Sequence, residues 1–125
     1  MARRLAGKRI LVVEDEYFIA SDLQRALRDE GAEVIGPVGD LARGLRMVAE
    51  GELDAAILDV NLEGSMSYPI ADQLAAERVP YMFLTGYDGW SLPPAYRSTP
   101  RLAKPFAQPD VIEALAALCT RNLPR

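Results

Sequence analysis

The sequence contains no histidine and a single cysteine among its 125 residues. Without histidine, the chain cannot form a Ser-His-Asp triad, use histidine as a general acid or base, or bind zinc through histidine. The cysteine, Cys119, cannot form an internal disulfide and lies among apolar residues in a helical pattern, which is typical of a buried packing residue. These absences predict a protein of a reducing compartment whose chemistry does not depend on histidine.

Long apolar runs and a strong positive charge are also absent. No unbroken apolar stretch reaches the roughly 18 residues of a membrane span, and the N-terminal "MARRLAGKR" lacks the apolar centre of a secretory signal. The formal net charge of -4 argues against a nucleic-acid-binding surface. We therefore expect a cytoplasmic protein with no direct contact to a membrane or to nucleic acid.

Apolar runs rich in β-forming residues alternate with helical patterns along the chain, which is typical of βα units around a parallel sheet. Glycine or proline marks several of the expected helix ends, and Asp40 is suited to cap the second helix. Strands are expected near residues 9–14, 33–38, 54–59, 80–85 and 99–103.

The segment "DGWSLPPAYRST" between the fourth and fifth expected strands has a different character. Pro93 and Pro94 exclude a regular helix interior there, so the fourth helix should be short or irregular. The sequence has no linker or low-complexity tract. We therefore expect a single domain over residues 1–125, with no output domain.

Polar residues with related chemistry follow four of the expected strands. Glu14 and Asp15 follow the first strand, Asp59 the third, Thr85 the fourth and Lys104 the fifth. Open parallel sheets bind ligands at the carboxyl ends of their strands. Carboxylates there suit Mg²⁺, and an aspartate beside the metal can attack a phosphoryl group whose oxygens are neutralised by the lysine and the hydroxyl. The pattern predicts formation of an aspartyl phosphate.

These acids, together with "LDVNLEG", "LTG" and "KPF", resemble the receiver domain of bacterial two-component response regulators over essentially the whole chain. The resemblance implies an α/β, flavodoxin-like fold with a doubly wound, five-stranded parallel sheet in the order 2-1-3-4-5. It also implies that Asp59 is the phosphoacceptor and that Thr85 and Lys104 contact the phosphoryl group. Receivers usually have a cis peptide between this lysine and the following proline, Pro105.

The same resemblance implies a metal site and protein partners. Mg²⁺, with Mn²⁺ as an alternative, would be bound by Glu14, Asp15, Asp59 and the backbone carbonyl of Asn61. The phosphodonor would be a sensor histidine kinase or a phosphotransfer protein, and the signal would pass to an unknown downstream protein by binding. No dedicated turnover reaction is expected, because the chain would only assist its own phosphorylation and dephosphorylation.

One position departs from the family pattern. Many receivers carry an aromatic switch residue three positions before the lysine, where this chain has Arg101. The stretch "FLTGYD" resembles a subgroup with a Phe-Ala-Thr-Gly-aromatic motif, which also lacks that aromatic. We therefore expect a switch or partner surface that includes Gly86, Tyr87, Trp90 and Arg101, and a reordering of residues 86–98 on phosphorylation.

Other interpretations fit parts of the pattern. Taken singly, the strand-end residues could be helix-start acids, a loop cap, a strand residue and a surface charge, and Glu16 is interpreted as an ordinary first-turn acid. A haloacid-dehalogenase-type phosphohydrolase needs a second acid two residues after its nucleophile, where this chain has Asn61. A flavodoxin-like module would bring a phosphate against the acids after the first strand. An unphosphorylated receiver-like scaffold is the main alternative.

Overall fold

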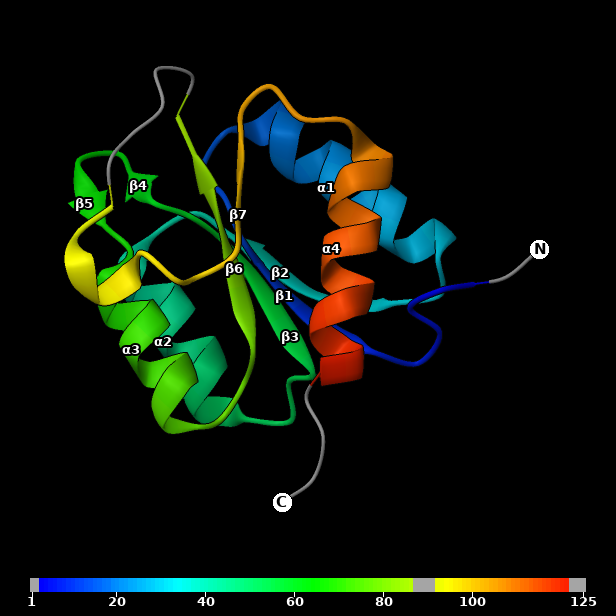
Figure 1. Ribbon diagram of the computed structural model, residues 1–125, viewed down its shortest axis with the longest axis horizontal. Helices are drawn as coiled ribbons and strands as arrows, with labels where there is room; N and C mark the ends of the chain where they lie inside the picture. Colours follow the sequence, from blue (N-terminus) through cyan, green and yellow to red (C-terminus); the bar gives the residue numbers. More distant parts are fainter. Residues whose placement is uncertain (1–2, 87–91, 122–125) are drawn as a thin grey trace.

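A five-stranded parallel sheet forms the centre of the computed structural model, which describes residues 3–86 and 92–121 (Figure 1). The spatial order is β2-β1-β3-β6-β7, and every neighbouring pair is parallel. The predicted sheet and strand order are therefore confirmed. The strands are β1 (Arg9–Val13), β2 (Glu33–Val38), β3 (Ala55–Asp59), β6 (Tyr81–Thr85) and β7 (Arg101–Ala103).

Helices cover both faces of the sheet, as the near-continuous apolar character of its central strands predicts. Side chains alternate between the two faces along β1, so that Ile10 and Val12 pack in one apolar core while Leu11 and Val13 pack in the other. Helices α1 and α4 lie on the first face, and α2 and α3 lie on the second (Figure 1). Their bounds are α1 (Tyr17–Asp29), α2 (Leu41–Glu50), α3 (Tyr68–Ala76) and α4 (Gln108–Arg121). In the described part of the chain, each helix is too short or too polar to cross a bilayer.

The ends of α2 follow the signals in the sequence. The Asp40 carboxylate accepts a hydrogen bond from the Arg43 backbone N–H at 2.8 Å, which caps the first turn of α2. Gly51 follows α2 with a φ of 81°, a value that favours glycine. These predicted helix boundaries are confirmed.

The connection between β6 and β7 is irregular, as the paired prolines predict. Its described residues contain only a 3₁₀ turn, η1 (Pro94–Tyr96), in place of a longer helix. Leu92, just before this turn, is buried in the core beneath α2 and α3. The connection is therefore anchored to the same face of the sheet as these two helices.

A two-stranded antiparallel hairpin that the sequence analysis missed follows β3. It consists of β4 (Asn61–Leu62) and β5 (Ser65–Met66). The two turn residues, Glu63 and Gly64, both have positive φ, which is the geometry of a type I′ turn. The Glu-Gly pair between two short segments is the signal that could have predicted it. The hairpin leads directly from the end of β3 into α3.

Within residues 3–86 and 92–121, two peptide bonds before proline are cis. The bond between Lys104 and Pro105 is cis, as the resemblance implies, and the bond between Gly36 and Pro37 is also cis, which was not predicted.

Candidate functional site

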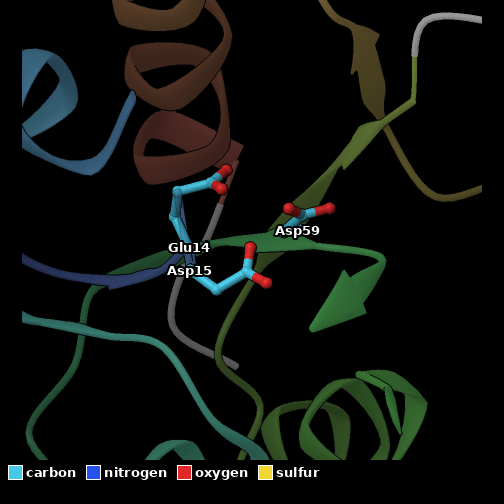
Figure 2. A group of neighbouring side chains, drawn as sticks. All are labelled: Glu14, Asp15 and Asp59. Atoms are coloured by element: carbon cyan, nitrogen blue, oxygen red, sulfur yellow. The ribbon is translucent and has the colours of Figure 1, made fainter. Parts of the chain in front are cut away.

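Three carboxylates meet at the carboxyl edge of the sheet. Glu14 and Asp15 follow β1, and Asp59 ends the neighbouring strand β3. One oxygen from each side chain lies within 4.8 Å of the others (Figure 2). Glu14 and Asp59 are buried, whereas Asp15 is half-buried. These residues, called the acidic centre below, come together as the sequence predicts.

Lys104 brings a positive charge into the acidic centre. It follows β7, and its Nζ lies 3.0 Å from Asp59 Oδ2 and 3.1 Å from Glu14 Oε1. The lysine side chain is only 5% exposed. A single buried ammonium therefore pairs with two of the three carboxylates of the acidic centre, and the group as a whole is left with excess negative charge.

Thr85 completes the set of predicted strand-end residues. It ends β6, one residue beyond Leu84, which pairs with Asp59 in the sheet register. The backbone N–H of Lys104 donates to the Thr85 carbonyl oxygen at 3.0 Å. Thr85 and Lys104 are thus held side by side at the edge that carries Asp59.

The environment of Glu14 favours its neutral form. Burial raises the pKa of Glu14 to about 7, opposed by a hydrogen bond from the Glu16 backbone N–H, and the Asp59 charge adds to the rise. Burial is therefore the main cause of the raised pKa of Glu14, and repulsion from Asp59 is a smaller one. For Lys104, burial lowers the pKa, but the hydrogen bond to Asp59 and the charge of Glu14 outweigh it, so the net pKa is raised and the ammonium is retained.

The raised pKa of Glu14 predicts a specific pH dependence of folding. Between its ordinary pKa of 4.5 and about 7, the folded chain holds a proton on Glu14 that the unfolded chain releases. In the absence of divalent metal, this group should therefore lower the free energy of unfolding by about 2 kcal/mol from pH 4 to pH 6. Urea titrations of the parent and of Glu14→Gln should diverge by this amount over that range. Parallel pH profiles would contradict the assignment.

Glu16 lies closer to the acidic centre than its interpretation as a first-turn acid implies. It occupies the N-cap position immediately before α1, without a side-chain capping hydrogen bond. Its carboxylate is 53% exposed, and Oε1 lies 3.6 Å from Lys104 Nζ. Glu16 thus lies at the start of the helix and is exposed, as the sequence indicates, and its additional ion pair at this distance contributes little to stability.

The remaining predicted residues surround this edge. Asn61 is exposed in β4, and its side-chain oxygen accepts a hydrogen bond from the Gly64 backbone N–H at 2.8 Å. Gly86 directly follows β6 and is half-buried, and Arg101 is exposed at the start of β7. Tyr87 and Trp90 lie outside the described residues.

Two features beside the acidic centre were missed by the sequence analysis. Tyr17 and Phe18 begin α1 with side chains that are 75% and 79% exposed, and their rings meet edge to face at 5.4 Å. A hollow of about 350 Å³ is lined by Tyr17 together with Glu14 and Asp15. The aromatic pair follows the acids directly in "EDEYF", but the helical pattern gave no indication that both rings face solvent.

The chemistry of the acidic centre fits a divalent cation. Three carboxylates from two adjacent strands offer the oxygen ligands that Mg²⁺ prefers. Glu14 Oε1 is buried and accepts no hydrogen bond from the described residues, although the ammonium lies 3.1 Å away. An additional positive charge would therefore satisfy both the excess charge and the unpaired oxygen.

Comparisons with known proteins agree with this arrangement. A sequence model of the family described as "Response regulator receiver domain" matches residues 10–116, which include the acidic centre, Thr85 and Lys104. The transcriptional regulatory protein PdtaR of Mycobacterium tuberculosis is 30% identical over 118 residues, covering 91% of this chain and 58% of PdtaR. The chain spans about half the length of the curated relatives it matches.

Solved structures give the same result. The solution structure of SdrG from Sphingomonas melonis Fr1 is 42% identical and has a TM-score of 0.80, covering 94% of this chain and 98% of that one. The receiver domain of sensor histidine kinase PA1611 from Pseudomonas aeruginosa PAO1 is 25% identical and has a TM-score of 0.74, covering 92% and 99%. That structure has a magnesium ion coordinated in its active site cleft.

Proposed function

The chain belongs to the family of response regulator receiver domains, and on this premise we propose that it accepts a phosphoryl group on Asp59 in a Mg²⁺-dependent reaction. The donor is a histidine kinase or a phosphotransfer protein, and the signal passes to a downstream protein by conformational change and binding. The observation that carries the proposal is the buried Asp59 carboxylate, which shares the acidic centre with Glu14 and Asp15 and lies 3.0 Å from Lys104 Nζ. The absence of an output domain stays a prediction.

The transfer step uses Asp59 as the nucleophile. One carboxylate oxygen attacks phosphorus, while the bond from phosphorus to the donor's histidine nitrogen breaks and its electron pair leaves with that nitrogen. Lys104 and the Thr85 hydroxyl neutralise the charge on the transferred oxygens. Both residues are tied together by the backbone hydrogen bond between them, which supports a joint role.

The metal site consists of the acidic centre and the Asn61 backbone carbonyl. Bound Mg²⁺ supplies positive charge that lets the carboxylates and the incoming phosphoryl group approach one another. Glu14 must be ionised to contribute fully, and its raised pKa makes that ionisation dependent on the added cation.

Two further observations support a phosphoacceptor that receives its group from a protein. Asn61 stands two residues after Asp59, and its amide is not titratable, so it cannot act as the second acid of a phosphohydrolase; its oxygen accepts the hydrogen bond from Gly64 within the hairpin. The exposed pair Tyr17 and Phe18 lies beside the acidic centre, and exposed aromatic residues are common in interface hot spots. A phosphodonor protein that packs on this pair would reach Asp59.

Intact-mass measurement tests the proposal. The parent and Asp59→Asn are incubated with acetyl phosphate or phosphoramidate in the presence of Mg²⁺, and again with a chelator. The parent should gain one phosphoryl group only with Mg²⁺, and the variant should gain none. An equal adduct on both proteins would refute Asp59 as the acceptor. No adduct with either donor, or with a panel of histidine kinases, would instead favour the unphosphorylated scaffold.

A further inference from the structure

A cluster of four aromatic rings lies between α3, β6 and η1. Tyr68 and Tyr96 stack with ring centroids 4.5 Å apart and an interplanar angle of 11°. Phe83 meets both rings edge-on, with each centroid 5.9 Å away, and Tyr81 meets Phe83 edge-on at 5.6 Å. This four-ring cluster therefore joins the irregular β6–β7 connection to a helix and to the sheet.

Tyr96 adds a polar contact to the four-ring cluster. Its hydroxyl donates a hydrogen bond to Asp72 Oδ1 of α3 at 2.8 Å. Burial, followed by the hydrogen bond to Asp72 and the Asp72 charge, raises the pKa of Tyr96 to about 12, so the phenol stays a donor at physiological pH. Residues 92–97 are thus fastened to α3 by one stacked pair and one charge-assisted hydrogen bond.

The fastened segment lies within the chain that links the two proposed phosphoryl-binding residues. It connects β6, which ends at Thr85, with β7, which precedes Lys104. Phe83 stands two residues before Thr85 and so faces the same side of the sheet. Its register partner in β7 is Arg101, the position where many receivers carry an aromatic switch. The four-ring cluster supplies an aromatic contact that Arg101 cannot make.

The arrangement in which residues 92–97 are fastened to α3, called the closed arrangement below, leaves one buried polar group without a hydrogen bond. The Tyr68 hydroxyl is buried and has no hydrogen-bond partner within residues 3–86 and 92–121. Leaving a buried hydroxyl unpaired is unfavourable, and movement of Tyr96 away from Tyr68 would remove the ring that is stacked on this side chain and give it more access to water. Hydration of the Tyr68 hydroxyl would offset part of the stacking energy lost when Tyr96 moves away. The closed arrangement and a released one, in which residues 92–97 have left α3, are therefore closer in free energy.

We propose that the Tyr96–Asp72 hydrogen bond and the Tyr68–Tyr96 stack form a latch that holds residues 92–97 on α3, and that phosphorylation of Asp59 releases it. The inference rests on the proposed function, because it requires that Asp59 be phosphorylated. The closed arrangement has a free Asp59 carboxylate bonded to Lys104, so it belongs to the unmodified aspartate. A phosphoryl group on Asp59 would break this contact with Lys104 and attract the Thr85 hydroxyl, which would change the packing at the end of β6 two residues from Phe83, the ring that meets both Tyr68 and Tyr96.

The latch and the phosphoryl group therefore compete, and weakening either one strengthens the other. Tyr96→Phe removes only the hydroxyl that reaches Asp72. In calorimetric titrations with Mg²⁺ present, this variant should bind beryllofluoride, a mimic of the phosphoryl group on aspartate, about fivefold more tightly than the parent, as expected from the loss of one such hydrogen bond. Asp72→Asn, on the exposed side of α3, weakens the same bond from its acceptor and should shift the affinity in the same direction.

Tyr81→Phe is the matched control for these calorimetric titrations. Tyr81 belongs to the same four-ring cluster, and its hydroxyl forms no hydrogen bond with the described residues. The affinity of Tyr81→Phe for beryllofluoride should equal that of the parent. Unchanged or weaker binding by Tyr96→Phe, or an equal gain in Tyr81→Phe, would overturn the latch.

A second measurement separates failure of the latch from failure of the proposed function. The backbone N–H of Tyr96 donates to the Pro93 carbonyl oxygen at 2.9 Å, and the backbone N–H of Thr99 donates to the Tyr96 carbonyl oxygen at 3.0 Å. Without beryllofluoride, Tyr96→Phe should speed amide hydrogen exchange at these residues about fivefold. Unchanged exchange overturns the latch even if Asp59 is phosphorylated. If the parent binds no beryllofluoride and gains no phosphoryl group, the proposed function fails, and release by phosphorylation fails with it.

Discussion

Replacing Lys104 by methionine is expected to destabilise the protein by about 3 kcal/mol at pH 8 in the absence of divalent metal. The ammonium lies 3.0 Å from Asp59 and 3.1 Å from Glu14, and the side chains of these acids are 10% and 0% exposed. Its removal leaves two buried carboxylates without a cation. The loss in the free energy of unfolding should lie at the lower end of the range for a broken buried ion pair, because Glu14, with a pKa already raised to about 7, can take up a proton.

Urea unfolding at several pH values measures this effect. The destabilisation should shrink as the pH falls below 7, where Glu14 becomes neutral. Lys8→Met, which alters the other lysine of the sequence, should change stability by less than about 0.5 kcal/mol. Adding Glu14→Gln and Asp59→Asn to Lys104→Met should restore most of the loss. A loss of less than about 1 kcal/mol at pH 8 would contradict the role of Lys104 as the counter-charge of the acidic centre.

Replacing Asp15 by alanine is expected to lower the rate of Mg²⁺-dependent phosphorylation by about 100-fold or more. The Asp15 side chain points toward Asp59, with their carboxylate oxygens within 4.8 Å (Figure 2). Its loss removes a proposed direct ligand of the cation, whereas a residue that only orients a ligand has a smaller effect. Time courses of intact mass with acetyl phosphate, over a range of Mg²⁺ concentrations, measure this rate.

Glu16→Ala is the matched control for Asp15→Ala. It removes the neighbouring carboxylate, which is 53% exposed and touches Lys104 at 3.6 Å. An exposed pair of this kind contributes little, so the phosphorylation rate should change by less than about threefold. Equal losses from the two variants would mean that the site extends to Glu16 and that its boundary has been drawn wrongly.

The sequence was sufficient to predict where the site residues lie. Asp59 and Thr85 each end an apolar run, so the choice of a parallel sheet brings them to one edge without any knowledge of loop structure. The strand order came from the resemblance, because spacing alone does not determine which strands are neighbours. The roles of Asp59, Thr85 and Lys104 stay predictions until the phosphorylation experiments are done.

Other features depend on contacts that local patterns do not contain. The burial of Glu14, which dominates its pKa, arises from the packing around the end of β1 and is invisible in three consecutive acids. The four-ring cluster joins Tyr68, Phe83 and Tyr96, which belong to three separate elements. The proximity of Glu16 to Lys104 joins residues from opposite ends of the described chain, so no local pattern indicates it.

The ion pair between Glu14 and Lys104 also bears on how the chain is synthesised. Its two partners are 90 residues apart, and the lysine directly follows β7, the last strand of the sheet along the chain. Before Lys104 has emerged from the ribosome, the carboxylates of Glu14 and Asp59 in the nascent chain lack their counter-charge, as they do in the Lys104→Met protein. Burial of the end of β1 is therefore unfavourable until β7 and Lys104 have been synthesised, which couples completion of the central sheet to the emergence of this last strand from the ribosome.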